Sequence, residues 1–493
     1  MKKINYLIII LLIPVFFSCD EFLDKQPLDQ LSPATFWKTQ NDADMALAGV
    51  YSRIQNWDII CDGQGRMGLG GWDNLTDNAF CELGDFDFNK MSNGKIYPTV
   101  GMISEVYNGA YQKIAACNNF LDNIGTVKWS DEAIGKQYSA EVRFLRAWSY
   151  YWLTQCFGDV PLITQILPTE KLTLSRAPKA DVLKQMYDDL DYAIANLPDK
   201  AYSGAKNNSG HLVKGSALAF KARVKLFNGE FSEAATLAKQ VISGGKFSLA
   251  PNYTSNFTED GGQDNCPEIL FSIKFKGPEQ LNRIEIIYGW WKGCNPIQEF
   301  IDCHEKGDLR LKLNVTQAGE AWPISLTWNP GYGGILPKGR YLTNTVWNKF
   351  YNPSTTAANW NTRGNDNVQI RYAEVLLVFA EAQNESSGPN ADVYAAVNAL
   401  RNRALLPNLP AGLSKSEMQE KIRNERRVEL VLEGQRYFDL KRWRIAGDVI
   451  PKLNYPPNQN VVKRYWDDHL YLWPLPQNEI DKDPVHLIQT PGY

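Results

Sequence analysis

Residues 422–443 read IRNERRVELVLEGQRYFDLKRW, and this stretch decides the fold. Its first apolar residues recur at the i, i+3 and i+4 positions that share one face of a helix. They are Val428, Val431 and Leu432. Further apolar side chains continue past Gly434, so we expect the stretch to be a helix that packs in the core.

The polar side of this predicted helix carries a run of like charges. Glu425, Glu429 and Glu433 repeat every four residues, a spacing at which like charges repel in an isolated helix. We expect Arg426, which can reach Glu429, together with Arg436 or arginines of other helices, to neutralise them in a partly buried ion network. Such a network fixes which helix packs where more surely than it adds stability. A carboxylate pair for acid–base catalysis is the alternative, but structural ion pairs perturb carboxylates just as readily.

The run 423–443 resembles the C-terminal signature of the SusD/RagB family, surface lipoproteins that capture nutrients for an outer-membrane transporter in Bacteroidetes. Three other stretches match that family in the same order. They are 140–162 (AEVRFLRAWSYYWLTQCFGDVPL), 370–384 (IRYAEVLLVFAEAQN) and 471–493 (YLWPLPQNEIDKDPVHLIQTPGY). The resemblance spans almost the whole chain and implies a mainly α fold built on tetratricopeptide-like helix pairs.

Helical periodicity elsewhere in the chain agrees with such a scaffold. Small residues at close-packing positions and a turn glycine, Gly229, make 216–242 look like one tetratricopeptide hairpin. The resemblance implies a second pair at 371–385 and 393–403. Further helices are expected at 43–51, 132–157 and 181–197.

From about 244 to 366 the helical period is lost, and Gly, Pro, Asn and Trp dominate. A compact protein rarely keeps so long an irregular stretch without a task. Short strands are expected at 269–275 and near 284–288. The Pro-rich end at 473–493 should run extended over the helical body.

We therefore expect a single domain over residues 34–493. Its helical scaffold comprises about 34–243 and 367–493, and the segment at about 244–366 is an irregular, loop-rich insertion that binds the ligand.

The N-terminus has the parts of a bacterial lipoprotein signal: a charged start, an apolar run from 4 to 17, and the small Ser18 before Cys19. The apolar run is too short to span a membrane. We expect a signal peptide at 1–18, lipidation of Cys19 and a polar tether at 19–33. The resemblance implies that acidic residues directly after the lipidated cysteine go with export to the outer face of the outer membrane.

The composition of the chain argues against some classes of function. The formal net charge is -3, from 52 basic and 55 acidic residues, so there is no electrostatic footprint for nucleic acid. The 8 cysteines have no zinc-type spacing, and we predict no cofactor and no metal. Cys61 with Cys81, or Cys294 with Cys303, could form disulfides outside the cytoplasm, although the sequence does not fix the pairing.

Common catalytic signatures are absent from the sequence: GxSxG, HExxH and a phosphate loop with GK[ST] do not occur. A GxGxxG spacing at 63–68 is not a dinucleotide site, because the apolar run before it is too short and glycines occupy 70–71 where a helix should start. We therefore predict that the protein is not an enzyme. The four histidines are well separated, at positions 211, 304, 469 and 486.

Aromatic residues interleaved with amides and acids indicate a saccharide site in the loops. Sugar rings offer an apolar face to an indole and hydroxyls to polar side chains. The Gly-rich flanks of Trp72 and of Trp290-Trp291 favour exposed rings over packed ones. The predicted ligand-binding residues are Trp72, Asp73, Asn74, Asp77, Tyr288, Trp290, Trp291 and Trp322.

Several functions fit these observations. The resemblance implies a cell-surface glycan-binding lipoprotein that delivers oligosaccharide to a SusC-like TonB-dependent transporter in the outer membrane. A glycan-hydrolysing enzyme on a helical scaffold is the first alternative, because paired carboxylates could serve it. Binding of another nutrient, such as a peptide, is the second, and a protein-binding helical repeat is a third that leaves the aromatic loops without a role.

Overall fold

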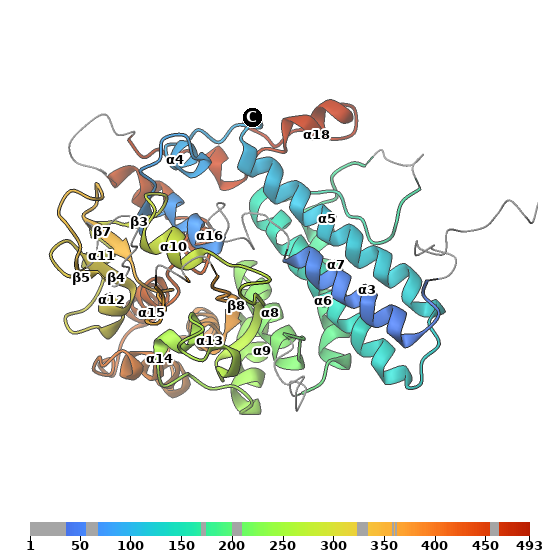
Figure 1. Ribbon diagram of the computed structural model, residues 1–493, viewed down its shortest axis with the longest axis horizontal. Helices are drawn as coiled ribbons and strands as arrows, with labels where there is room; N and C mark the ends of the chain where they lie inside the picture. The colour runs from blue at the N-terminus through green and yellow to red at the C-terminus, as the bar shows by residue number, and fades with distance from the viewer. Residues whose placement is uncertain are drawn as a thin grey trace, which may run out of the picture.

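The computed structural model describes residues 36–55, 68–168, 174–199, 210–322, 334–356, 359, 362–453 and 463–493. The predicted signal peptide, Cys19 and the tether at 19–33 lie outside these residues. The described chain is mainly α-helical with a few short strands, as expected (Figure 1).

The N-terminal part is a layer of long helices (Figure 1). Its members are α3 (Gln40–Ile54), α5 (Gly101–Asn123), α6 (Glu132–Phe157) and α7 (Lys179–Asn196). Helix α6 packs against both α5 and α7, while α3 lies on α5 and α6. Thr39 and Asp42 form a capping box that fixes the start of α3. The C-terminal half of α6 is buried on nearly all sides, and it supplies the aromatic centre of the core.

Two helix hairpins follow the tetratricopeptide-like pattern, and both predictions are confirmed. The first is α8 (Lys214–Phe227) with α9 (Phe231–Gly244), and the second is α13 (Tyr372–Ser387) with α14 (Ala391–Arg403). Gly229 turns the first hairpin with a φ of 77°, which suits glycine best. Because α9 also packs on α13, the two hairpins form one continuous body although the insertion separates them in sequence.

The stretch 422–443 is not one helix, contrary to our prediction. Helix α15 (Lys415–Glu429) ends early, and α16 (Arg436–Arg442) starts after a turn in which Leu432 and Gly434 have φ of 60° and 72°. The carboxylate of Asp73 accepts a hydrogen bond from the Leu432 backbone N–H at 2.6 Å, which holds this turn open. Periodicity could not show the break, because the partner comes from a distant part of the chain.

The predicted ion network exists and is fully buried. Arg371 donates to Glu268 at 2.8 Å, to Glu429 at 2.6 Å and to Glu433 at 2.8 Å. Arg310 adds contacts to Glu425 at 2.5 Å and to Glu429 at 2.8 Å. The acids are therefore neutralised by cations from other elements, as the like-charge spacing required.

Two details of that network were not foreseen. Arg426 pairs with Asp439 at 2.8 Å and not with Glu429. Burial alone would raise the pKa of Glu429, but Arg403, Arg371 and Arg310 together hold it below its ordinary value.

Short paired strands and short helices make up the insertion and also occur outside it. Strand β2 (Ile269–Ile273) forms where a strand was expected and pairs antiparallel with β8 (Asn367–Arg371). The other antiparallel pairs are β1 (Ala79–Phe80) with β3 (Asn295–Pro296), β4 (Val315–Gln317) with β7 (Thr345–Trp347), and β5 (Ala321–Trp322) with β6 (Gly334–Ile335). The short helices are α4 (Asp87–Ser92), α10 (Ile284–Gly289), α11 (Gln298–Asp302), α12 (Leu309–Asn314), α17 (Ala446–Val449) and α18 (Gln477–Lys482).

Two predictions for the insertion are wrong. The run near 284–288 is helix α10 and not a strand, and the Asn282 side chain accepts from the Ile284 N–H at 3.2 Å at its start. A short, fully buried apolar run does not distinguish the two structures by period. Cys294 and Cys303 are free thiols and not a disulfide.

The C-terminal segment covers the helical body largely as expected. The Trp473 backbone N–H donates to the Cys156 carbonyl at 2.7 Å, which fastens the segment to the end of α6. Helix α18 interrupts its extended course and lies close to one end of α5 (Figure 1).

Candidate functional site

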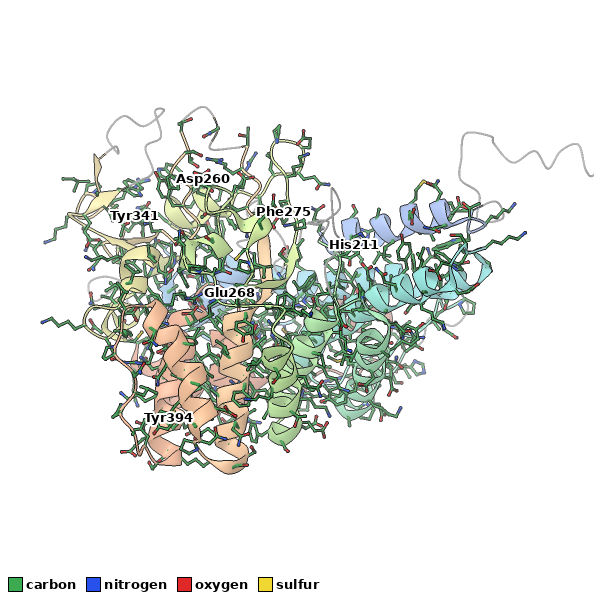
Figure 2. The ribbon with its side chains drawn as sticks, turned by 90° about the horizontal axis from the view of Figure 1, so that it is seen from below. His211, Asp260, Glu268, Phe275, Tyr341 and Tyr394 are labelled. Carbon is green, nitrogen blue, oxygen red and sulfur yellow. The ribbon has the colours of Figure 1, made fainter. Side chains whose placement is uncertain are left out.

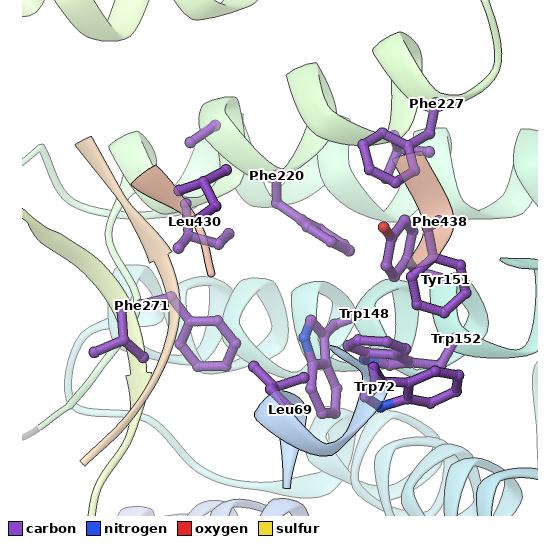
Figure 3. Close-up of a cluster of buried hydrophobic side chains, with 14 of the residues drawn as sticks. Leu69, Trp72, Trp148, Tyr151, Trp152, Phe220, Phe227, Phe271, Leu430 and Phe438 are labelled. Carbon is purple, nitrogen blue, oxygen red and sulfur yellow. The ribbon is translucent and has the colours of Figure 1, made fainter. Parts of the chain in front are cut away.

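Trp72 is a core residue, so the expectation that a glycine-rich loop presents it is wrong. Its exposed fraction is 0%. Its ring stacks on Trp152, at 5.9 Å and 26° (Figure 3). It also stacks on Trp473, at 5.1 Å and 12°. Glycine flanks serve packing here: a Cβ on Gly70 would lie 2.6 Å from the Tyr288 hydroxyl. Neither face of the indole is available to a ligand.

The polar residues beside Trp72 are also engaged within the protein. Asp73 caps the Leu432 turn, and burial raises its pKa to about 7. Asn74 donates to a backbone carbonyl at 3.0 Å. Asp77 accepts two hydrogen bonds from Arg436, both at 2.8 Å. Burial alone would raise the pKa of Asp77, but the neighbouring arginines hold it below its ordinary value. Burial therefore contradicts the assignment of all three as ligand partners.

The aromatic residues of the insertion divide into buried and accessible ones. Tyr288 is buried against Phe350, and Trp322 is buried with its indole N–H donating to a backbone carbonyl at 3.2 Å, so neither offers a free ring face. Trp290 is half-buried. Trp291 is 37% exposed. Of the eight predicted residues, the structure leaves Trp290 and Trp291 at the surface.

A pocket of about 520 Å³ lies elsewhere, between α3 and the end of strand β2. It forms where the insertion meets the N-terminal helices, a junction that His211 and Phe275 mark (Figure 2). Its walls come from α3, α6, the segment just before α8, strand β2 and the segment after β2. They include Tyr51, Gln55, Tyr138, His211, Lys274 and Gln280.

One wall of this pocket is organised by a buried carboxylate, that of Glu141 on α6. It accepts a hydrogen bond from the Tyr51 hydroxyl at 2.6 Å, from His211 Nδ1 at 2.6 Å and from Gln137 Nε2 at 3.2 Å. Because a carboxylate only accepts, His211 carries its proton on Nδ1 in this contact. The Tyr51 and His211 rings meet edge to face at 5.6 Å, so both rings are held in place without a ligand.

The opposite wall ties the end of α3 to the insertion. Gln55 donates from Nε2 to the Lys274 carbonyl and to Gln280 Oε1, the latter at 3.2 Å. The Lys274 ammonium pairs with Asp366 and, at 2.9 Å, with Asp264. Burial alone would lower the pKa of Lys274, but these two carboxylates outweigh it and keep the pKa above its ordinary value. The pocket therefore has a fixed cation beside amides.

Aromatic rings, hydroxyls, amides and one cation around a concave space match the two sides of a saccharide. Sequence reasoning missed this pocket, because its residues are scattered between positions 44 and 280 and only the fold brings them together. The predicted site relied on the many tryptophans of the sequence, but most of these side chains pack in the core. No local sequence pattern connects the residues of this pocket.

Candidate metal sites and candidate membrane spans are both missing from the described residues. Among them, no three His, Cys, Asp or Glu side chains come together in an arrangement that could hold a metal ion. None of the helices in the described part of the chain has the length and apolar character to cross a membrane.

Similar proteins place the chain in a family. Residues 239–493 match the SusD family, and residues 21–226 match a family described as starch-binding associating with outer membrane. SusD-like protein P2 of Formosa agariphila is 28% identical over 532 residues, covering 100% of both chains.

Solved structures show the same fold. A SusD-like protein of Bacteroides fragilis is 25% identical with a TM-score of 0.80, covering 95% of this chain and 100% of that one. Surface glycan-binding protein A of Bacteroides thetaiotaomicron, solved with laminarihexaose, has a TM-score of 0.75 at 20% identity, covering 92% of this chain and 100% of that one. The chain therefore belongs to the SusD family.

Proposed function

We propose that this protein binds oligosaccharides on the cell surface and delivers them to a SusC-like TonB-dependent transporter. The observation that carries the binding step is the pocket between α3 and β2, whose Tyr51 and His211 rings are fixed by Glu141 before any ligand arrives. A neighbour of the same fold was solved with a bound glucan hexasaccharide, which supports the ligand class.

Fixed rings favour binding because less side-chain freedom is lost when the ligand arrives. If two ring surfaces each lose on the order of 100 Å² of apolar area to a sugar, the gain is about 5 kcal/mol. Ordering of the saccharide and exchange of its hydrogen bonds with water offset part of this. We expect affinity between about 1 μM and 1 mM, which suits capture followed by release.

A glycan panel tests the proposal, with binding and product release both measured. Tyr51→Ala and Tyr138→Ala should each weaken binding of the selected glycan at least about tenfold, a loss of about 1.4 kcal/mol. Tyr97→Ala is the matched control, because this tyrosine is 56% exposed and is not among the residues that line the pocket. Release of product by the wild type would instead favour the hydrolase alternative.

The accessible pair Trp290 and Trp291 remains a proposed second contact for the same glycan. Arg340 lies over the Trp290 ring at 5.4 Å, which already covers part of it. If Trp291→Ala abolishes binding while Tyr51→Ala and Tyr138→Ala do not, the ligand sits on the insertion surface and not in the pocket.

We further propose that Cys19 is lipidated and holds the protein at the outer face of the outer membrane. One acyl chain anchors only marginally, so the several chains of a bacterial lipoprotein are needed for lasting attachment. Cys19→Ala should release the protein from membranes. Protection of the wild type from protease on intact cells would contradict the outward orientation.

Delivery requires a transporter partner. The family supports this part of the proposal, and purification from outer membranes in mild detergent tests it. A β-barrel protein should co-purify with the wild type; recovery of this protein alone would contradict the delivery step.

A further inference from the structure

A second and larger pocket, of about 1120 Å³, lies at the other end of α6. Its walls come from the last turn of α6, the α8–α9 turn, α16 and the C-terminal segment. Tyr138 in the first pocket and Gln155 in the second are about 25 Å apart along α6, from a rise of about 1.5 Å per residue. The two pockets are therefore separate sites on one helix.

Cations dominate the lining of this second pocket. They are Arg176, Lys179, Lys441, Arg442 and Arg444. Asp159 is the single carboxylate among the described residues that line it. The whole chain has a formal net charge of -3, so this concentration of positive charge is local.

Lys441 is the most buried of these cations, with 8% of its surface exposed. Its ammonium donates to the Gln155 carbonyl at 3.1 Å and lies over the rings of Tyr437 and Phe438, at 5.0 and 5.5 Å. No carboxylate of the described residues lies within ion-pair distance of it. Burial, helped by the charges of Lys179 and Arg444, lowers the pKa of Lys441 to about 8.

Two neighbouring cations are held in place without a close ion pair in the described chain. Arg176 donates to three backbone carbonyls, those of Asp159 at 2.8 Å, Phe157 at 3.1 Å and Ile488 at 3.2 Å. Arg444 lies over the Tyr471 ring at 4.1 Å. The protein thus fixes the position of both guanidinium groups.

Arg442, in contrast, is neutralised by two carboxylates of the chain. It donates to both oxygens of Glu381, at 2.5 and 2.6 Å, and to Asp439 at 2.8 Å. Lys441, Arg176 and Arg444 differ from it in having no such partner within the described chain. A buried cation without an ion-pair partner, such as Lys441, is costly, and an anion entering the pocket would remove that cost.

We propose that this pocket binds the oxyanion of an acidic oligosaccharide, either a sulfate ester or a uronate carboxylate, beside Lys441, Arg176 and Arg444. The volume exceeds what a free inorganic ion fills, and it lies just above the usual range of about 300–1,000 Å³ for small-molecule sites. Tyr471 and Leu472 supply apolar surface, and the amides of Asn228 and Gln489 that line the pocket are held in place by hydrogen bonds to backbone groups. The inference rests on the proposed function as a glycan-binding protein, but it concerns a different site.

The test is calorimetric titration with three matched oligosaccharides of one backbone: sulfated, uronate-containing and neutral. The wild type should bind one of the anionic forms at least about tenfold more tightly than the neutral form. Lys441→Met and Arg444→Gln should each remove most of this preference, and raised salt should weaken it. Lys246→Gln is the control, because Lys246 is an exposed cation just beyond the far end of α9.

The outcomes separate this site from the first pocket. Tyr51→Ala should leave the anionic preference intact, so loss of neutral-glycan binding and loss of the anionic preference are independent results. Equal binding of the neutral and anionic forms would overturn the inference, as would an anionic preference that survives both pocket substitutions. Binding of inorganic sulfate or of phosphatidylglycerol vesicles without binding of the anionic oligosaccharides would also overturn it. Arg444 is exposed, so its variant tests the proposal even if Lys441→Met alters folding.

Discussion

Trp72 shows why exposure is harder to infer than secondary structure. Its local sequence, rich in glycine and acids, is typical of a surface loop. Its real surroundings are Trp152 and Trp473, which no local pattern connects to it. Glycine flanks have two physical uses, loop freedom and close approach of other side chains, and at Gly70 the second applies.

Trp72→Ala should destabilise the protein strongly, because it leaves a cavity between two stacked indoles. We expect a loss of about 3–5 kcal/mol in the free energy of unfolding, measured by urea denaturation. Trp291→Ala is the matched control and should change stability by less than about 1 kcal/mol, since that ring is partly in solvent. Equal stability of the two variants would mean that Trp72 is not in the core.

The two helix hairpins lie where the sequence pattern predicted them, whereas the contacts between helices could not be predicted from that pattern. The pairs α8–α9 and α13–α14 lie where periodicity and the resemblance predicted them, because a helix hairpin is specified within some thirty to forty residues. The like-charged acids of α15 indicated that cations must lie beside them. In the structure these cations are Arg310, Arg371 and Arg403, which come from three other elements. The sequence therefore indicates that a counter-charge is needed, but it does not indicate which residue supplies it.

Glu429→Gln should be one of the most damaging single changes in α15. It removes the common acceptor of three arginines and leaves buried positive charge, at a cost of about 3–5 kcal/mol. Glu420→Gln, at an exposed position on the same helix, is the control. Because the folded-state pKa of Glu429 lies below its ordinary value, the wild type should lose this stability as the pH falls below the usual glutamate range. The variant should show a shallower acid dependence in denaturation at several pH values.

Lys441 should give the protein a second pH dependence of stability, in the alkaline range. Its pKa is about 8 in the folded state and ordinarily about 10.5, so between these values the unfolded chain holds a proton that the folded chain lacks. The free energy of unfolding should therefore rise with pH across that interval. Lys441→Met should reduce the slope, leaving the part due to Lys349, whose pKa burial also lowers to about 8. An unchanged slope in the variant, compared with Lys246→Met, would show that Lys441 is ionised normally.

The molecule carries its two pockets at opposite ends of helix α6, one where the insertion meets the N-terminal helices and one beside the C-terminal segment. The mainly α architecture and the position of the insertion could be predicted, because long stretches of the sequence either keep or lose helical periodicity. The pocket between α3 and β2 could not, since Tyr51, Tyr138 and His211 become neighbours only after folding. Resemblance to a family supplied the class of ligand but not the residues that meet it.

Binding at that pocket should stabilise the whole protein and slow exchange locally. At a glycan concentration of 100 times Kd, the free energy of unfolding should rise by about 2.7 kcal/mol. Amide hydrogen exchange should slow in α3 and around 274–280, while α14, far from His211 in the fold, serves as the internal control (Figures 1 and 2). Protection centred on 289–293 instead would place the ligand at Trp290 and Trp291.

The stack of Trp72 on Trp473 also has a consequence for when the protein can finish folding. A chain is made from its N-terminus, so Trp72 must wait, with one face uncovered, until nearly every other segment that packs around it has been synthesised. The helix hairpins can form early, but the aromatic centre closes last. We expect such a chain to remain open during much of its synthesis, which is the condition that the proposed transport across a membrane requires.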